Sequence, residues 1–150
     1  MRKLLTLAIM CFCFVFPAFA GNDLIIKQSP HDVATTLDRL SGIMKKKGIT
    51  IFARVDHGAG AAKINASLRP TQLLIFGNPK LGTPLMQSNQ QIGIALPLKA
   101  LAWQDADGKT WLAYTKPSVL AERFSISDRA KVIAKMTGAL DKLTNAAIKQ

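Results

Sequence analysis

The sequence contains two histidines, His31 and His57, and one of them has a carboxylate beside it. Asp56 and His57 stand where a predicted strand ends, a position at which side chains often face a cleft. A carboxylate that orients an imidazole and raises its basicity is the minimal arrangement for a general base. Adjacent residues of a strand point to opposite faces, however, so the two side chains need not touch. His31 falls in the first turn of a predicted helix, which is more typical of a solvated surface residue.

A second candidate site follows a predicted buried strand, where residues 77–84 read Gly-Asn-Pro-Lys-Leu-Gly-Thr-Pro. Its two glycines suggest a phosphate loop, but that loop needs Lys and then Ser or Thr after the second glycine, whereas Pro84 follows Thr83. A weaker interpretation is that free backbone N–H groups at a helix start, with Lys80 nearby, hold a carboxylate or phosphate. A rigid structural turn is the alternative. The candidate ligand-binding residues are therefore Asp56, His57, Gly77, Asn78, Lys80 and Thr83.

Several kinds of chemistry have no support in the sequence. Its cysteines, Cys11 and Cys13, both lie in the N-terminal apolar segment, so the rest of the chain has no thiol for catalysis, disulfides or metal binding. With two histidines and no cysteine, we expect no metal site and no cofactor. A nucleophile-elbow G-x-S-x-G motif and paired catalytic acids are also absent. These observations favour a binding module over an enzyme.

Residues 1–20 have the pattern of a secretory signal peptide. Arg2 and Lys3 precede an apolar core over residues 4–16, and Ala18-Phe19-Ala20 is a small-x-small cleavage site. We expect cleavage before Gly21, a periplasmic or secreted protein, and no integral membrane span afterwards. Cleavage removes two of the 20 basic residues and none of the nine acidic ones, leaving a net charge of +9. That excess favours a small anionic or amphiphilic ligand, because nucleic acid is an unexpected partner for an exported protein.

The elements that position these residues follow from the hydrophobic pattern. Ser29-Pro30 closes a first strand and predicts a helix with Ser29 as N-cap, whose apolar face is Val33, Leu37, Leu40 and Met44. Residues 49–55 alternate as a half-buried strand, residues 58–68 read as a short helix or irregular crossover, and residues 73–76 read as a buried central strand. Thr83-Pro84 predicts a second helix start.

The last third of the chain predicts a hairpin and a long helix. Residues 98–104 and 109–115 alternate on either side of Asp105-Ala106-Asp107-Gly108, which suits a hairpin loop. Residues 125–147 form a helix with one apolar stripe. The fold class is α+β: after the signal peptide, residues 21–150 form one domain. Its single antiparallel-rich sheet has about five strands, a helix after strand one and a long C-terminal helix on one face.

Several of these motifs together resemble a known family. Residues 68–80 read Leu-Arg-Pro-Thr-Gln-Leu-Leu-Ile-Phe-Gly-Asn-Pro-Lys, and residues 82–86 read Gly-Thr-Pro-Leu-Met. With residues 96–99, 103–108 and 111–114, this stretch is similar to the bacterial and archaeal domain of unknown function 302, over most of residues 24 to 124. The resemblance implies a topology like that of the TATA-binding protein, which does not carry DNA binding with it. Phe124 stands where members often have a histidine, which argues against any mechanism that needs a second histidine.

Three functions remain open at this point. The first is a binding module whose concave sheet face, under the long helix, holds a small or amphiphilic anionic ligand reached past His57 and the turn at residues 77–83. The second is an envelope protein that interacts through its sheet edge or terminal helix, a homodimer included. The third is a hydrolase or isomerase with His57 as base, Asp56 as its orienting group and the turn as oxyanion site. We favour the first.

Overall fold

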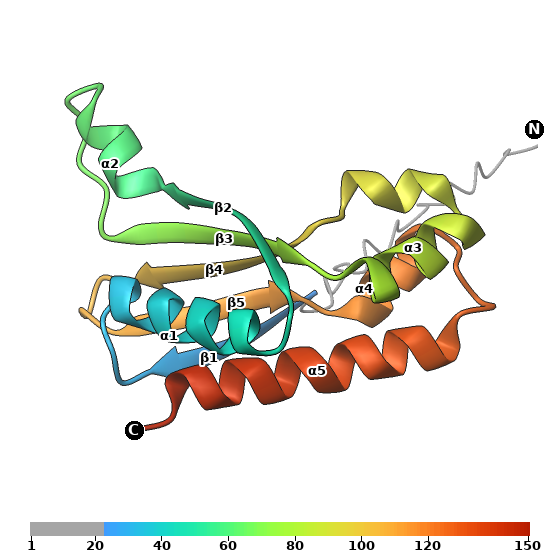
Figure 1. Ribbon diagram of the computed structural model, residues 1–150. Helices are drawn as coiled ribbons and strands as arrows, with labels where there is room; N and C mark the ends of the chain where they lie inside the picture. Colours follow the sequence, from blue (N-terminus) through green and yellow to red (C-terminus); the bar gives the residue numbers. More distant parts are fainter. Residues whose placement is uncertain (1–22) are drawn as a thin grey trace, which may run out of the picture.

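The computed structural model describes residues 23–150, so the predicted signal peptide, its cleavage site before Gly21 and both cysteines lie outside the described residues. Within this part, one antiparallel sheet has the strand order β1-β5-β4-β3-β2 (Figure 1). Its strands are β1 (Leu24–Ser29), β2 (Thr50–Asp56), β3 (Thr71–Gly77), β4 (Leu98–Gln104) and β5 (Thr110–Thr115). The helices are α1 (Val33–Lys46), α2 (His57–Ala62), α3 (Pro79–Ser88), the 3-10 helix η1 (Gln90–Ile94), α4 (Pro117–Arg123) and α5 (Ala130–Ile148). The predicted α+β fold with five strands is confirmed.

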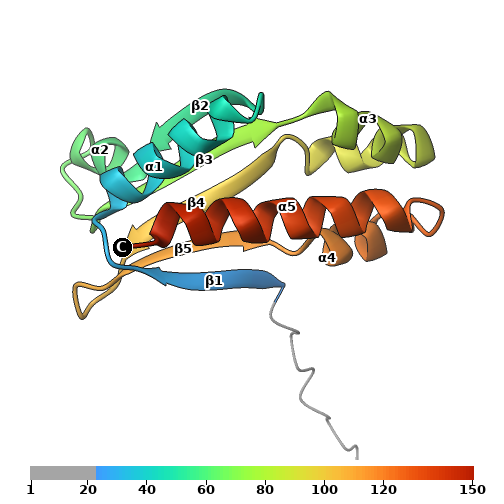
Figure 2. The ribbon, with the colours of Figure 1, turned by 60° about the horizontal axis from the view of Figure 1, so that its bottom comes forward.

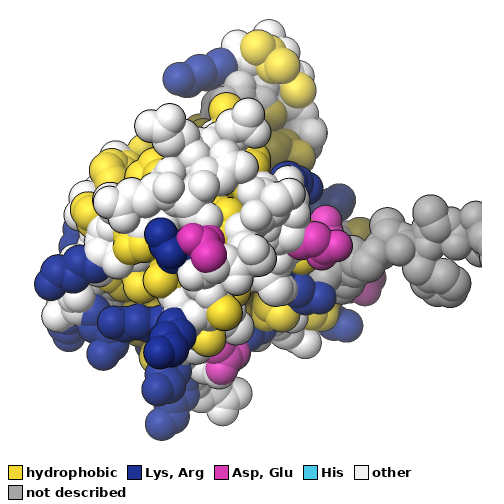
Figure 3. Space-filling model, turned by 90° about the vertical axis from the view of Figure 1, so that its right-hand side faces the viewer, with side chains coloured by type: hydrophobic (Ala, Val, Ile, Leu, Met, Phe, Trp, Pro, Cys, Tyr) yellow, Lys and Arg dark blue, Asp and Glu magenta, His cyan; other side chains and the backbone are white. Residues whose placement is uncertain are grey.

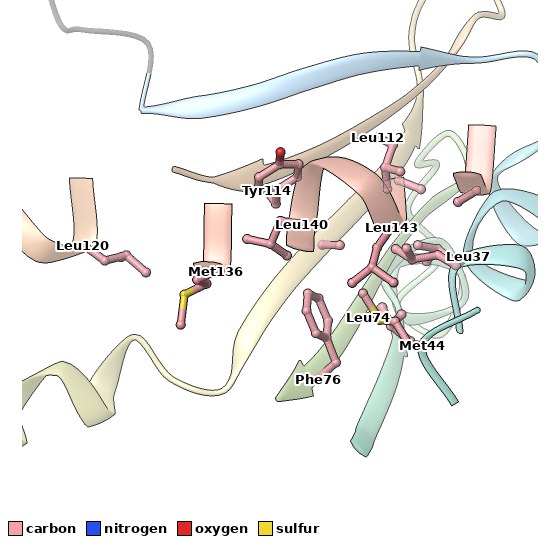
Figure 4. Close-up of a cluster of buried hydrophobic side chains, with 14 of the residues drawn as sticks. Leu37, Met44, Leu74, Phe76, Leu112, Tyr114, Leu120, Met136, Leu140 and Leu143 are labelled. Atoms are coloured by element: carbon pink, nitrogen blue, oxygen red, sulfur yellow. The ribbon is translucent and has the colours of Figure 1, made fainter. Parts of the chain in front are cut away.

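The core lies between the sheet and one layer of helices. α1 and α5 lie side by side on the same face of the sheet (Figures 1 and 2). Leu74 and Phe76 of β3 and Leu112 of β5 point toward this layer, because alternate residues of a strand share a face. Figure 4 shows them turned toward Leu140 and Leu143 of α5. The space beneath the long helix is thus packed with side chains where α5 crosses the centre of the sheet.

Helix α1 buries the face that its spacing predicts, but a different residue caps it. Val33, Leu37, Leu40 and Met44 are all buried. Asp32, not Ser29, is the N-cap, since its Oδ1 accepts a hydrogen bond from the Thr35 N–H at 2.7 Å. The Ser29 hydroxyl bonds the Thr36 hydroxyl at 2.7 Å and accepts the His31 N–H at 3.2 Å, just ahead of the helix. The helix therefore begins at Val33, three residues after the start at Pro30 that the sequence predicts.

The predicted hairpin is confirmed. β4 and β5 pair in register, with Trp103 opposite Trp111. Asp105 orders the loop between them, because its carboxylate accepts the N–H groups of Asp107 and Lys109 and the indole N–H of Trp111 at 2.6 Å. The Trp111 hydrogen bond and the two backbone hydrogen bonds hold the pKa of Asp105 below its usual value. The loop is therefore closed by a charged group that prefers its ionised form.

Two strand predictions need correction. Residues 73–76 lie in β3, which is next to the edge strand, and the central strand is β4. Residues 49–55 do not keep one inward face, because a bulge in β2 between Ile51 and Ala53 shifts the register with β3. An extra residue in a strand moves every later side chain to the opposite face. Ile51 consequently faces the helices with Phe76, while Ala53 and Val55 are exposed on the other face.

The long C-terminal helix begins later than its pattern indicates. α5 begins at Ala130, because Ser125 has a positive φ of 51° that a right-handed helix does not allow. α4, which the pattern did not predict, precedes this turn. The stripe itself is correct, since Met136, Leu140, Leu143 and Ala147 are buried.

A polar contact fastens the edge strand β1 to α5. The Lys27 ammonium donates to Asp141 Oδ1 at 2.7 Å, Thr144 Oγ1 at 2.8 Å and Asn145 Oδ1 at 2.6 Å. Its side chain is only 15% exposed, so solvent screens these contacts less than those of a surface ion pair. This contact joins two segments that are more than a hundred residues apart.

Candidate functional site

The residues expected to form one site lie at opposite ends of the sheet. β2 and β3 are antiparallel, with Asp56 opposite Gln72 at one end and Thr50 opposite Gly77 at the other. Gly77 lies five positions after Gln72 along β3, which corresponds to roughly 17 Å of extended chain. Asp56 and His57 therefore do not join Gly77, Asn78 and Thr83.

The Asp56–His57 pair has a structural role at its own end. Asp56 is the N-cap of α2, and its carboxylate accepts the Ala59 N–H at 2.8 Å and the Gln72 side-chain amide at 2.9 Å. The Ala59 hydrogen bond, with help from Gln72, lowers the pKa of Asp56. His57 is exposed as the first residue of α2, and no hydrogen bond links it to Asp56 in the part of the chain described here. The expected orientation of the imidazole by the carboxylate is thus not formed.

The turn after β3 is a helix cap and leaves no open group of N–H donors. Asn78 is the N-cap of α3, with Oδ1 accepting the Lys80 N–H at 2.9 Å, and Pro79 is the first helical residue. The N–H groups of Leu81 and Gly82 bond the Asn78 carbonyl at 2.9 and 3.0 Å. Thr83 and Pro84 lie inside α3, so the predicted helix start there is wrong by five residues. The proposed anion cradle has no free donors, because the first-turn N–H groups already have acceptors.

The same turn borders a pocket of about 350 Å³ at this end of the sheet. Its lining comes from the start of β2, the end of β3, α3, the segment from η1 to β4, and the middle of α5: Ile49, Phe52, Phe76, Gly77, Asn78, Pro79, Leu81, Gly82, Thr83, Met86, Gly93, Leu96, Pro97, Leu98, Met136, Ala139 and Leu140. Three of the sequence candidates are among them, Gly77, Asn78 and Thr83. Lys80 lies beside the lining, on α3, and Asp56 and His57 are at the far end of the sheet. Among residues 23–150, no charged side chain belongs to this lining.

Glycines shape two walls of the pocket. A Cβ on Gly77 would lie 3.3 Å from Phe52 Cε2 and 3.6 Å from Pro97 Cβ, so the absence of a side chain lets the two rings approach the strand end. A Cβ on Gly82 would meet only Leu96 Cδ1, at 3.6 Å, an ordinary contact. The pocket therefore has one wall that is closely fitted and one that could accept a larger residue.

Basic side chains lie near the apolar pocket. Lys135 and Lys142 stand four residues before and three residues after Ala139 on α5, so they share a side of the helix with this lining residue, and both are exposed. Figure 3 shows this end of the molecule, where Lys and Arg gather along the lower part of the surface, below exposed hydrophobic side chains. The arrangement can hold an apolar group inside and an anionic group outside.

Most of the lining could not be found from the sequence. Phe52, Met86, Leu96, Met136 and Ala139 stand in segments that read as ordinary core or loop. The sequence contains one signal, because Phe52 is a large aromatic residue at an outward position of its predicted strand. In the structure its side chain is 57% exposed. The residues 23–150 contain no cluster of three or more His, Cys, Asp or Glu that could hold a metal ion, and no helix long and apolar enough to cross a bilayer.

Comparison with known proteins finds relatives that match most of this chain. The protein named fluoride-specific ion channel FluC 1 of Brucella suis biovar 1 is 46% identical over 119 residues, which cover 78% of this chain and 47% of that protein. The FluC 1 protein of Brucella abortus biovar 1 is 46% identical over 119 residues and is covered to 44%. This chain thus spans less than half the length of these relatives.

A solved structure shares the fold. The crystal structure of an uncharacterized conserved protein DUF302 from Bacillus stearothermophilus superposes with a TM-score of 0.77, covering 85% of this chain and 99% of that one, at 17% sequence identity. The family model for the domain of unknown function DUF302 matches residues 25–143, which include the pocket-lining part of α5 and all of the sheet except Leu24. The chain belongs to the DUF302 family, as the motifs at residues 68–86 indicate.

Proposed function

We propose that this chain is a non-catalytic binding module for a small amphiphile, whose apolar part occupies the pocket between β3, α3 and α5. The single observation that carries the proposal is an apolar pocket of about 350 Å³ that borders the hydrophobic core. Small-molecule sites in proteins are mostly apolar cavities of about 300–1,000 Å³ with a few polar groups. Asn78 and Thr83 are the polar groups of this lining.

The pocket size limits the ligand. If each carbon needs about the volume of one water molecule, roughly 30 Å³, the pocket takes about a dozen carbons. An alkyl chain or a substituted aromatic ring of that size fits. The excess of basic residues supports an anionic head group, because Lys135 and Lys142 are exposed on the side of α5 that borders the pocket.

A series of n-alkyl carboxylates from eight to sixteen carbons tests this proposal by calorimetric titration of residues 21–150. Each added methylene should strengthen binding about fourfold while it enters the pocket, since burial of a methylene contributes about 0.8 kcal/mol. The gain should stop near a dozen carbons, when the pocket is full. Alkyl trimethylammonium ions of equal length should bind more weakly. No binding of any member, or affinity that keeps rising with length, would contradict an apolar pocket of this size.

The salt dependence of binding distinguishes the contribution of the ligand's charged head group from that of its apolar part. Exposed charges are screened beyond about 8–10 Å at physiological ionic strength, so carboxylate binding should weaken as salt rises from 0.01 to 0.15 M. An uncharged n-alkanol of the same length should not respond. Equal salt dependence for the carboxylate and the alkanol would remove the anionic head group from the proposal and leave the apolar pocket.

A second function, interaction with an envelope protein, is favoured by the relatives. The matched part makes up 44–47% of Brucella proteins named fluoride-specific ion channels. In these Brucella proteins the matched part is therefore joined in one polypeptide to another part of similar length. We propose that it modulates such a partner. Deleting the matched part from the Brucella suis protein, followed by fluoride efflux from liposomes, tests this: an unchanged rate and an unchanged fluoride dependence would refute it.

We also propose that the chain is exported with cleavage before Gly21, on the evidence of the charged start and the Ala18-Phe19-Ala20 site. The intact mass of the protein recovered outside the cytoplasm measures this directly. A mature species that retains residues 1–20 would refute the localisation and return two cysteines to the mature chain.

A further inference from the structure

One face of the sheet carries no helix and is nevertheless apolar. α1 and α5 both lie on the opposite face (Figures 1 and 2). Ten apolar residues alternate away from the helices: Leu24 and Ile26 of β1, Trp111 and Ala113 of β5, Leu101 and Trp103 of β4, Leu73 and Ile75 of β3, and Ala53 and Val55 of β2. Four polar residues, Gln28, Thr71, Lys99 and Thr115, lie on the same face at the ends of its strands. We call this set the open face. Leu24, Ile26 and Val55 are 39%, 42% and 38% exposed.

This composition is unusual for a solvated sheet. An antiparallel sheet with one face in water normally alternates apolar and polar residues, whereas strands covered on both faces read as continuous apolar runs. Leu24-Ile25-Ile26, residues 73–76 and residues 111–114 are such runs. In a chain with twice as many basic as acidic residues after position 20, Lys99 is the one charged residue at the strand positions of this face. The apolar runs in the sequence and the scarcity of charge on this face of the structure both favour a face that is covered by a partner.

Both tryptophans of the protein lie on the open face. Trp103 and Trp111 are directly opposite each other on β4 and β5. The Trp111 indole N–H already has an acceptor in Asp105, so a partner can cover that ring without leaving a donor unsatisfied. Aromatic enrichment with depletion of charge is the composition of the centre of a protein–protein interface.

We propose that the open face binds the same face of a second copy of this chain, as two sheets packed face to face. Five strands about 4.8 Å apart and at least six residues long give a footprint of roughly 450 Å². Side-chain relief raises the accessible area above this footprint, toward the roughly 600 Å² per partner at which stable interfaces begin. The loop after α2, which projects beyond the sheet (Figure 1), carries two more exposed apolar residues, Ile64 and Leu68, 76% and 49% exposed.

The charge of the open face favours a second copy of this chain over a lipid surface as its partner. A protein face that lies on a membrane combines apolar residues with several Lys or Arg residues that contact anionic lipid. The open face has only Lys99, and its ammonium is turned back to the carbonyl of Pro97 at 3.1 Å. Two such faces can meet without like-charge repulsion at their centre, although each copy is strongly basic elsewhere.

The test uses residues 21–150 and two measurements. Sedimentation velocity at tens of micromolar should give twice the monomer mass. Ile26→Lys with Val55→Lys, both at exposed positions of one cross-strand row, should give the monomer mass with an unchanged circular dichroism spectrum. Ile94→Lys, at an 84% exposed position on η1, is the matched control and should stay dimeric.

Tryptophan fluorescence gives an answer from the unmodified protein. Dilution through the dissociation range should raise quenching by acrylamide several-fold, because both indoles become exposed together. A monomer mass with concentration-independent quenching would overturn the proposal. So would a dimer that survives both lysines, since its interface would lie elsewhere, or a blue shift produced by anionic lipid vesicles in a protein that is monomeric in solution.

Discussion

Filling the pocket from Gly82 is the sharpest way to separate ligand binding from stability. The Gly82→Leu variant adds four carbons at a position whose Cβ has ordinary contact with Leu96 and no clash with backbone. At roughly 30 Å³ per carbon the new side chain takes on the order of a third of the 350 Å³ pocket. A dodecanoate chain then loses burial of about four methylenes, worth about 3 kcal/mol, so its affinity should fall roughly 200-fold.

The same change should leave the fold intact or strengthen it. Gly82 lies within α3, where a glycine costs up to about 1 kcal/mol relative to a good helix former, so the melting temperature should rise by a few degrees. Gly42→Leu is the control, since Gly42 lies in α1, has open space at its Cβ and does not line the pocket. Calorimetric titration with dodecanoate and thermal melts measure both quantities. Unchanged dodecanoate affinity in a folded Gly82→Leu protein would refute the pocket as the binding site.

Three further predictions concern the residues around the sheet. His57→Ala should leave dodecanoate affinity unchanged and alter stability by less than about 0.5 kcal/mol, because the side chain is exposed and lies at the far end of β2 from the pocket; titration and melts check it. Asp105→Ala should lower the melting temperature at pH 6, and the gap to wild type should narrow as pH falls: because the pKa of Asp105 is lowered by folding, its stabilisation is present above the unfolded pKa and is lost as pH falls through the folded pKa. A gap that does not narrow between pH 6 and pH 2.5 would contradict this. Lys27→Met should lower the melting temperature by roughly 5 °C by releasing β1 from α5, which hydrogen exchange at Ile25 and Ile26 localises to that edge.

The elements could be predicted where one local rule dominates. The buried stripe of α1, the stripe of α5 and the β4–β5 hairpin follow from spacing alone, because periodicity and turn chemistry act over a few residues. Helix starts failed where two caps compete. Asn78 and Pro79 cap α3 five residues before Thr83-Pro84, and Asp32 caps α1 while the Ser29 hydroxyl bonds Thr36 and the His31 N–H. Periodicity cannot rank such alternatives.

The sequence by itself determined the α+β class, the family through the motifs at residues 68–86, and three residues of the pocket, Gly77, Asn78 and Thr83. Only the tertiary structure decided that these three join α5 and not Asp56 and His57. The reason is strand direction: antiparallel pairing puts the end of β2 beside the start of β3, so two strand ends that look equivalent in sequence lie at opposite ends of the sheet. The bulge in β2 is likewise invisible to periodicity, because one unpaired residue reverses which face every later side chain occupies.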